Sequence, residues 1–125
     1  MATSPTQRTL KALRDIGCTC GIVERFLSHA GPFGLRVDLF GIIDIICCDP
    51  QRGVIGIQAC GMAFSAHWKK LTIEKAAESR TWLETPGTSL EIWSWSKRKR
   101  KLVKGFSKRG YWTPRIKEIT LEDLR

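Results

Sequence analysis

The stretch RVDLFGIIDIICCDPQRGVIGIQACG, residues 36–61, contains two apolar, β-rich runs, and each run holds one conspicuous polar residue, Asp44 or Gln58. The turn-forming sequence DPQRG separates the runs. The pattern predicts two adjacent antiparallel strands, over about 36–48 and 53–60, that bring both polar side chains to one end of a sheet. A buried carboxylate is costly unless it is paired, hydrogen-bonded or bound to a metal ion. An oxygen-lined metal site is therefore one interpretation of Asp44, and a structural aspartate that accepts backbone N–H groups is the other.

The rest of the chain alternates between helical and strand patterns. Apolar residues at helical spacing precede Gly17, and strict alternation of apolar and polar residues marks the strand before a basic segment. The predicted elements are a helix that ends at Gly17, a strand over 19–27, a long helix over 63–83, and strands over 90–95 and 111–119. This order predicts one α/β domain over residues 1–125, with a mixed sheet of about five strands flanked by helices and with residues 1–5 disordered.

The charge balance favours a polyanionic partner. Lys and Arg total 21 against 12 acidic residues, which gives a formal net charge of +9. Nucleic acid is the leading candidate, although anionic membranes and ribosomes also attract basic proteins. No apolar run approaches the length of a membrane span, and the N-terminus has no apolar segment of signal-peptide type. We therefore expect a soluble, cytoplasmic protein that does not act at a membrane.

The five cysteines form no CxxC pair, and most of them lie in apolar, strand-like runs. This pattern is typical of reduced, buried thiols in a cytosolic protein and does not favour a zinc site. The chain also has no Gly-rich phosphate-binding loop. We therefore expect no small-molecule cofactor.

The two central runs resemble the signature of the PD-(D/E)XK nucleases, and within that superfamily the small Holliday-junction-resolvase-like and phage-type proteins. That signature has an Asp at the start of one strand, a short hairpin, and Glu-x-Lys on the next strand. Here IIDII resembles the Asp strand, and Ile57-Gln58-Ala59-Cys60 resembles the Glu-x-Lys strand, with Gln58 in place of the acid and Cys60 in place of the lysine. The resemblance covers roughly residues 10–96. It implies a restriction-endonuclease-like fold, Mg²⁺ or Mn²⁺ as the cofactor, and a homodimer.

The resemblance also implies a set of metal ligands. Asp44 is the first candidate, with the side-chain amide oxygen of Gln58 and the main-chain carbonyl of Ala59 as further ligands, since hard cations prefer oxygen. Asp38 precedes Asp44 by six residues, so on a continuous strand both carboxylates lie on one face. Asp38 can supply the negative charge that Gln58 lacks. The alternative is a turn residue or an ion-pair partner of Arg36.

The Cys60 thiol is mostly protonated near neutral pH and cannot replace an ammonium group. Nucleases of the superfamily that the chain resembles can carry this lysine on the following helix, so the resemblance implies that the assisting residues lie on the long helix. His67 and Lys70 are three residues apart and share a helical face, and Lys69 is a further candidate. The alternative for the lysines is an ordinary polar surface stripe. Glu24, on the first predicted strand, is a weaker acidic candidate, and an exposed strand glutamate is its other interpretation.

Eight of the thirteen residues from 97 to 109 are Lys or Arg, which predicts a mobile, basic hairpin loop. The neighbouring aromatic residues favour contact with phosphates and unstacked bases, and a solvated hairpin tip is the alternative. The predicted nucleic-acid-binding residues are Arg52, Lys97, Arg98, Lys99, Arg100, Lys101, Lys104, Lys108 and Arg109.

Together these features predict a metal-dependent DNA endonuclease, either Holliday-junction-resolvase-like or specific for another DNA structure. One alternative is a catalytically inactive nucleic-acid-binding module of the same fold, because both the acid and the lysine of the signature are replaced. A second alternative is a basic RNA-associated protein in which the polar strand residues are structural. Dependence on a divalent metal distinguishes the first function from both alternatives.

Overall fold

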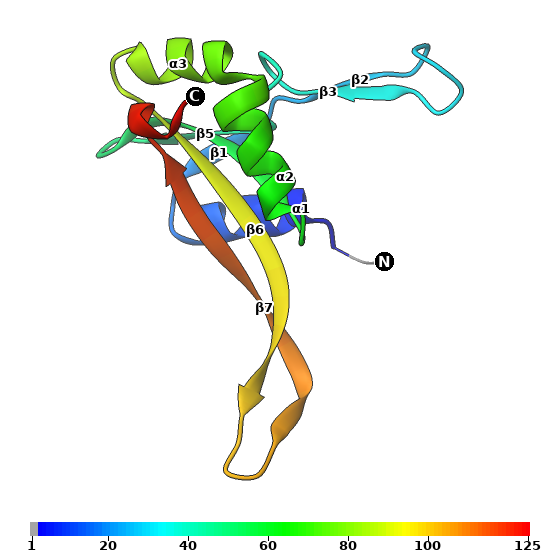
Figure 1. The fold of residues 1–125 in the computed structure, drawn as a ribbon. Helices are drawn as coiled ribbons and strands as arrows, with labels where there is room; N and C mark the ends of the chain where they lie inside the picture. The colour runs from blue at the N-terminus through cyan, green and yellow to red at the C-terminus, as the bar shows by residue number, and fades with distance from the viewer. Residues whose placement is uncertain (1–2) are drawn as a thin grey trace.

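The structure is a computed structural model that describes residues 3–125. The elements in chain order are α1 (Pro5–Asp15), β1 (Thr19–Ile22), β2 (Arg25–Leu27), β3 (Leu35–Val37), β4 (Ile45–Asp49), β5 (Gly53–Cys60), α2 (Phe64–Lys69), a π-helical turn (Lys70–Glu74), α3 (Ala76–Glu84), β6 (Thr88–Lys101), β7 (Phe106–Ile119) and a 3-10 helix (Leu121–Asp123) (Figure 1).

Five strands form the main sheet in the order β1-β4-β5-β6-β7. The β5 and β6 strands are parallel, and the other three neighbouring pairs are antiparallel. The β2 and β3 strands pair only with each other and form a separate ribbon. The prediction of a single α/β domain with a five-stranded mixed sheet is thus confirmed for residues 3–125, where three α-helices flank the sheet.

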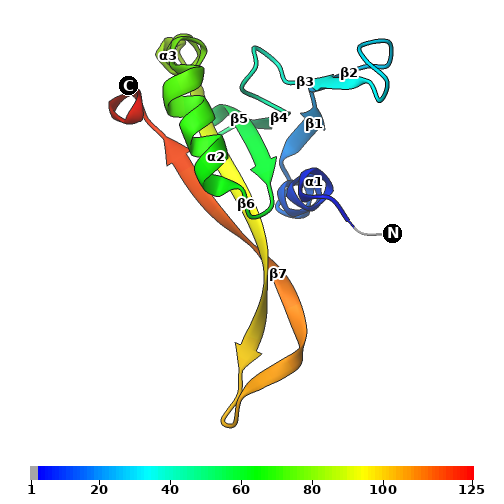
Figure 2. The same cartoon turned by 45° about the vertical axis from the view of Figure 1, so that its right-hand side comes forward.

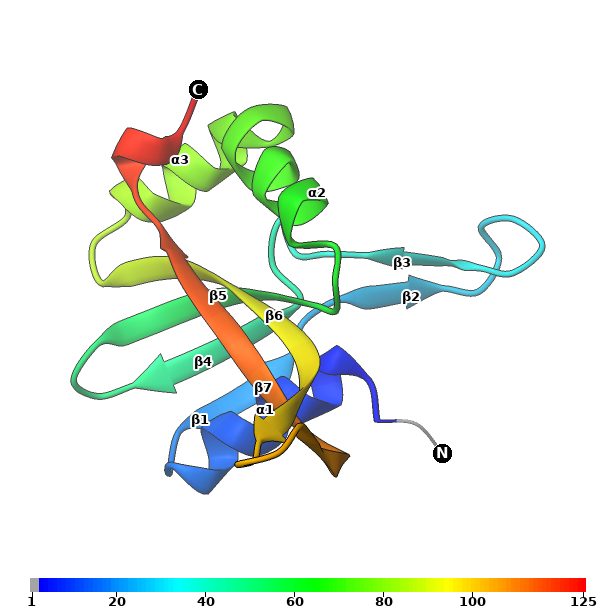
Figure 3. The same ribbon diagram turned by 60° about the horizontal axis from the view of Figure 1, so that its bottom comes forward.

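The helices cover opposite faces of the sheet, with α1 on one side and α2 and α3 on the other (Figure 3). Strand periodicity explains how β5 serves both faces, because successive side chains point in opposite directions. Ile55 and Ile57 pack against Leu10 and Leu13 of α1. Cys60, of the opposite parity, belongs to the cluster around Leu71 and Ile92. Gln58 shares the parity of Cys60, so its side chain faces the helix that follows β5.

Two predicted strands are wrong as continuous elements. The predicted strand 19–27 divides into β1 and β2, which belong to different sheets. The predicted strand 36–48 divides into β3 and β4, because a tight turn bridged by Leu39 and Ile43 reverses the chain between them. In that turn Phe40 and Gly41 both have positive φ values, 56° and 75°. An extended strand cannot contain such residues, since left-handed backbone reverses its direction.

The start of α1 corrects the prediction that residues 1–5 are disordered. The Ser4 hydroxyl accepts a hydrogen bond from the Gln7 N–H at 3.1 Å and caps the helix, and Pro5 is its first residue. Proline suits this position because its missing N–H would have no helical partner. Residues 1 and 2 lie outside the described part of the chain.

The basic segment is a strand pair rather than the predicted loop over 97–109. The β6 strand extends to Lys101 and β7 begins at Phe106, so the connection contains only four residues. Cross-strand pairs continue out to Lys101 and Phe106, with one irregularity in register. The hairpin extends well beyond the body of the molecule (Figure 1). Continuous backbone hydrogen bonding therefore holds the basic side chains in fixed register despite their mutual repulsion.

The predicted long helix over 63–83 is present as three consecutive pieces, α2, the π-helical turn and α3. Within residues 3–125 no helix combines the length and the apolar character needed to cross a lipid bilayer.

Candidate functional site

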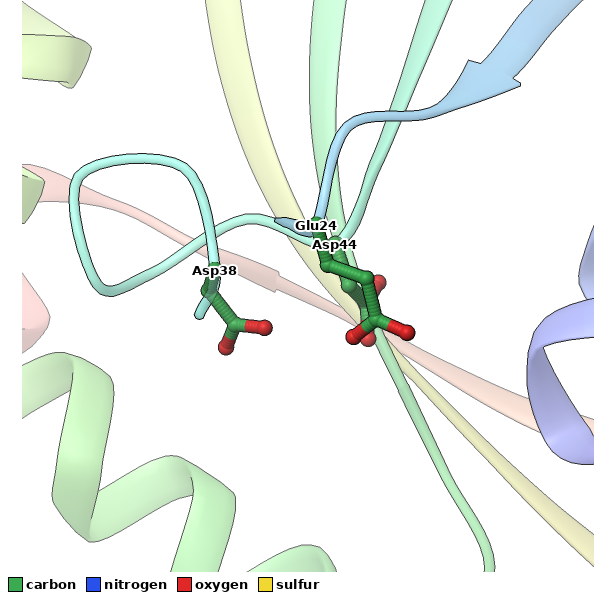
Figure 4. Close-up of side chains that lie close together, drawn as sticks. All are labelled: Glu24, Asp38 and Asp44. Atoms are coloured by element: carbon green, nitrogen blue, oxygen red, sulfur yellow. The ribbon is translucent and has the colours of Figure 1, made fainter. Parts of the chain in front are cut away.

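Three carboxylates meet where the ribbon joins the main sheet. Glu24 lies between β1 and β2, Asp38 follows β3, and Asp44 precedes β4. One carboxylate oxygen from each residue lies within 4.8 Å of the others (Figure 4). Because two of these residues flank the ribbon, its pairing brings Glu24 and Asp38 together although fourteen positions separate them.

Asp44 is the most deeply placed of the three carboxylates, with a relative exposure of 6%. Both of its carboxylate oxygens accept the Ala59 N–H at 3.2 Å. The pKa of Asp44 is nevertheless raised from 3.8 to about 7. Burial is the largest cause and the negative charges of Asp38 and Glu24 add to it, while the Ala59 hydrogen bond and the Lys70 charge oppose the rise. Among residues 3–125, the positive charge near the Asp44 carboxylate therefore does not offset the cost of its burial.

A chain of polar contacts links this cluster to the helical side of the sheet. The Gln58 side-chain amide donates to Asp38 Oδ2 at 2.6 Å, and Lys70 Nζ donates to the same oxygen at 2.8 Å. Gln58 Oε1 lies 2.7 Å from His67 Nδ1. Gln58 is only 1% exposed, so these partners satisfy an amide that burial would otherwise make costly.

The amide orientation of Gln58 assigns the proton on His67. Because the Gln58 nitrogen donates to a carboxylate, its oxygen faces Nδ1, and Nδ1 must carry a hydrogen to satisfy it. Burial lowers the pKa of His67, and the Lys70 charge lowers it further, while Asp38 opposes both effects. The imidazole is therefore neutral at pH 7, with Nε2 as a free acceptor.

Five of the predicted site residues, Asp38, Asp44, Gln58, His67 and Lys70, are brought together by these contacts. Asp38 reaches Asp44 through the tight turn and the ribbon and not, as predicted, through shared strand parity. The side-chain oxygen of Gln58, which was predicted to bind the metal ion, contacts His67 instead of joining the three clustered carboxylates. Gln58 therefore orients Asp38 and His67. Ala59 contributes its N–H to Asp44. Lys69 is exposed and makes no hydrogen bond or ion pair among the described residues.

Glu24 belongs to the cluster, although the sequence predicted it only as a weaker acidic candidate. Its side chain is 19% exposed and lies 3.5 Å from the Arg36 guanidinium. A continuous strand over 19–27 would have left Glu24 on an outer surface, whereas the break between β1 and β2 turns it toward Asp44. The available signal was the spacing of Glu24 and Asp38 on either side of a Gly- and Pro-containing loop, which is typical of a short ribbon.

Cys60 does not take over a catalytic role at this site. The residue is 5% exposed, and burial raises the pKa of its thiol. A neutral thiol is neither a cation nor a nucleophile. Within the described residues all five cysteines are free, and Cys48 alone is exposed.

Arg52 lies at the other end of the sheet from the carboxylates. Six residues of strand separate it from Gln58 along β5, which corresponds to about 20 Å. Its guanidinium lies 2.6 Å from the Glu91 carboxylate. The Glu91 carboxylate therefore already occupies one side of the Arg52 guanidinium, and a nucleic-acid phosphate, the predicted partner of Arg52, would have to compete with it.

The basic hairpin projects from the same end of the sheet as the carboxylates. Gln58 is level with Ile92 on the parallel β6 strand, and β5 ends opposite Ser94. The β6 strand then continues for seven more residues, or about 20 Å, past the end of β5. Figure 2 shows the pair extending away from the body as a twisted arm. The chain carries no acidic residue between Glu91 and Glu118, so the arm is uniformly positive.

Aromatic residues accompany these charges. Trp93 and Trp95 are buried and belong to the core, where the Trp95 indole donates to Thr9 Oγ1 at 2.8 Å. Tyr111 and Trp112 are exposed on β7. Cations lie over both rings, with Arg100 5.7 Å from the Tyr111 centroid and Arg8 4.0 Å from that of Trp112.

Comparison with known proteins found no match to this chain among protein-family models, curated proteins or solved structures.

Proposed function

We propose that this protein is a metal-dependent DNA endonuclease of the PD-(D/E)XK type, with a restriction-endonuclease-like fold. The observation that carries the proposal is the convergence of Glu24, Asp38 and Asp44 within 4.8 Å at one end of the sheet. Lys70 contacts this cluster directly at Asp38, and His67 is linked to it through Gln58. Like charges at this spacing repel one another, and a bound cation would offset that repulsion.

The placement of the signature supports this assignment. Asp44 stands directly before β4, the β4–β5 turn is a short hairpin, and Gln58 lies near the end of β5. This is the strand, hairpin and strand arrangement that the resemblance implies. The departures from the signature have compensating groups nearby, since Glu24 restores the carboxylate that Gln58 lacks, and Lys70 on the following helix supplies the ammonium that Cys60 lacks.

The donor set fits Mg²⁺ or Mn²⁺. Carboxylate oxygens are the ligands that hard divalent cations prefer, and the raised pKa of Asp44 reflects a carboxylate without enough compensating charge. Glu24, Asp38 and Asp44 would hold the ion. A divalent ion bound there supplies a Lewis acid that activates water and offsets the negative charge of a phosphodiester.

The remaining residues of the site have roles that follow from their contacts. Lys70 neutralises part of the charge of Asp38 and presents an ammonium group to a phosphate oxygen that approaches the cluster. Gln58 holds His67 in the tautomer whose Nε2 accepts a proton. His67 is therefore the proposed general base for the attacking water, since its pKa lies below its ordinary value and leaves it neutral at pH 7.

The hairpin supports DNA as the substrate. Lys97 to Lys101 are exposed, and they belong to an arm that continues beyond the end of β5, the same end of the sheet at which the carboxylates lie. Arrays of Lys and Arg bind phosphates through counterion release and position a duplex without reading its sequence.

A paired cut in a four-way junction needs two active sites. The proposal therefore includes a homodimer, and light scattering would test this oligomeric state.

Cleavage assays test the proposal directly. Labelled four-way junction, linear duplex and single-stranded DNA are incubated with the protein and Mg²⁺, Mn²⁺ or EDTA, alongside Asp44→Ala and Asp49→Ala. We expect cleavage that needs the metal, disappears with Asp44→Ala and survives Asp49→Ala, because Asp49 is the last residue of β4, at the opposite end of the sheet.

Two results would favour the alternatives. Tight DNA binding without cutting in any metal would indicate an inactive module of the same fold. Preference for RNA over all DNA structures, with no effect of metal, would indicate an RNA-associated protein.

A further inference from the structure

The β2–β3 ribbon is the second projection of the molecule, and it leaves the body in a different direction from the basic hairpin (Figure 1). Its two strands contain only three residues each, and neither strand pairs with the main sheet. A two-stranded ribbon of this size has little stability of its own in water. Packing against the main sheet therefore does not explain why the ribbon projects from the body.

The ribbon exposes an unusual amount of apolar side chain. Phe33 at the tip is 92% exposed, and Phe26 and Leu35 on the strands are 59% and 53% exposed. Phe26 has a packing role within the ribbon, because a Cβ atom added to Gly34 would overlap its ring. Phe33 has no such role. An aromatic ring held at a tip without packing partners is suited to contact a flat ligand.

The charge of the ribbon favours a polyanion. Residues 25–37 contain Arg25 and Arg36 and no acidic residue. The Arg36 side chain is 75% exposed, so its pairing with Glu24 leaves most of the guanidinium accessible. A hollow of about 400 Å³ lies between the ribbon and the start of α1, and Glu24, Phe26 and Arg36 are among its lining residues. The hollow therefore adjoins the carboxylate cluster directly.

The ribbon is also tied to the site through the chain itself. Its first strand begins one residue after Glu24, and its second strand ends one residue before Asp38. Any ligand that contacts the ribbon base is consequently held beside two of the three carboxylates.

From these observations we infer that the ribbon binds unpaired bases close to the cleavage site, with Arg25 and Arg36 as phosphate contacts near its base and Phe33 at its tip as the residue that stacks on a base a few nucleotides away from the scissile phosphate. This inference rests on the proposed nuclease function and adds a source of substrate specificity to it. In a continuous duplex the base faces are already stacked, and inserting a ring costs unstacking energy. Gaps, flaps and branch points expose those faces at no such cost, and aromatic stacking on them is insensitive to sequence. The ribbon thus makes DNA with unpaired bases the preferred substrate class.

Binding measurements in EDTA isolate this contact from cleavage. Fluorescence anisotropy is recorded for a continuous duplex and for the same duplex with a three-nucleotide gap, using the wild type, Phe33→Leu and Phe33→Tyr. Leu keeps the apolar character without the ring, and Tyr keeps the ring. We expect Phe33→Leu to lose about tenfold in affinity for the gapped DNA and less than twofold for the duplex, with Phe33→Tyr close to wild type. Ile16→Ala, at an exposed apolar residue after α1, is the control and should change neither affinity.

Each other result overturns the inference in a recognisable way. Equal losses on both DNAs, or no loss with Phe33→Leu, would show that the ribbon does not read unpaired bases, while Mg²⁺-dependent cleavage by the wild type would leave the nuclease proposal intact. Conversion of a dimer to a monomer by Phe33→Leu, measured by light scattering, would make the ribbon an interface between copies of the chain. Absence of DNA binding by the wild type in EDTA, together with absence of cleavage in Mg²⁺ or Mn²⁺, would refute both proposals.

Discussion

Replacement of Asp44 by Asn should abolish activity and yet stabilise the fold. Folding raises the pKa of this carboxyl from 3.8 to about 7, a change of about three pH units. Each unit corresponds to about 1.4 kcal/mol, so an ionised Asp44 destabilises the folded protein by up to about 4 kcal/mol at pH 8. Asn removes this cost and retains one oxygen to accept the Ala59 N–H. After about 1 kcal/mol for the weakened hydrogen bond, a net gain of about 2 to 3 kcal/mol remains.

The pH dependence has a definite sign. Below pH 7 the folded protein retains the Asp44 proton while the unfolded chain releases it down to about pH 4, so wild-type stability rises as the pH falls through that range. The advantage of Asp44→Asn should therefore be largest at pH 8 and should shrink to about 1 kcal/mol or less by pH 5. In a domain of 125 residues the gain at pH 8 corresponds to a rise in Tm of roughly 10 °C.

Thermal unfolding in EDTA at pH 5 and pH 8 measures this effect, and a second series with Mg²⁺ extends it. Bound metal should raise the Tm of the wild type and leave that of Asp44→Asn unchanged, because only the folded carboxylate cluster binds the ion. Asp49→Asn is the matched control, since Asp49 accepts the Gln51 N–H in a turn and its loss should lower stability slightly. A lower Tm for Asp44→Asn than for wild type at pH 8 would refute the reasoning and make Asp44 a structural residue.

Three further predictions follow from particular contacts. Lys70→Met should reduce cleavage at least 100-fold without changing the Kd for DNA more than threefold, whereas Lys69→Met, at an exposed neighbour, should leave single-turnover rates near wild type. Gly53→Ala should destabilise the fold by about 2 kcal/mol or more in urea unfolding, because Gly53 has a φ of 92° and an added Cβ would overlap a main-chain carbonyl. Thr9→Val should cost about 1 to 3 kcal/mol in the same assay, since it leaves the buried Trp95 indole without its acceptor, and Thr9→Ser should recover most of that loss.

The elements of the main sheet were predictable because their patterns are regular. The β5 strand agrees with its predicted bounds of 53–60, and α1 ends near the predicted glycine. The alternation in β6 correctly indicated a strand, and burial of Trp93 and Trp95 explains its apolar face. Asp44 and Gln58 were recognisable as site residues because polar groups in apolar strands need partners.

The ribbon and the hairpin were less predictable for physical reasons. Three-residue strands show no measurable periodicity, so β2 and β3 were absorbed into longer predicted strands. The outer half of β6 is exposed on both faces and therefore has no alternation to detect. Glu24 was underestimated because its position depends on the ribbon. His67 and Lys70 were identified from the resemblance and from their shared helical face. The direct contact of Lys70 with Asp38 and the link of His67 to Asp38 through Gln58 required the three-dimensional arrangement.

The β6 strand has a mechanical consequence, because one continuous strand begins in the buried core and ends at the tip of the basic hairpin. Residues 90–95 are buried, and residues 97–101 are exposed. Amide hydrogen exchange should therefore become progressively faster along this single strand, as the outer pairs with β7 open without disturbing the core. If a polyanion binds at the tip as proposed, the added protection from exchange should be largest in these outer pairs and smallest in the buried pairs beside Gln58.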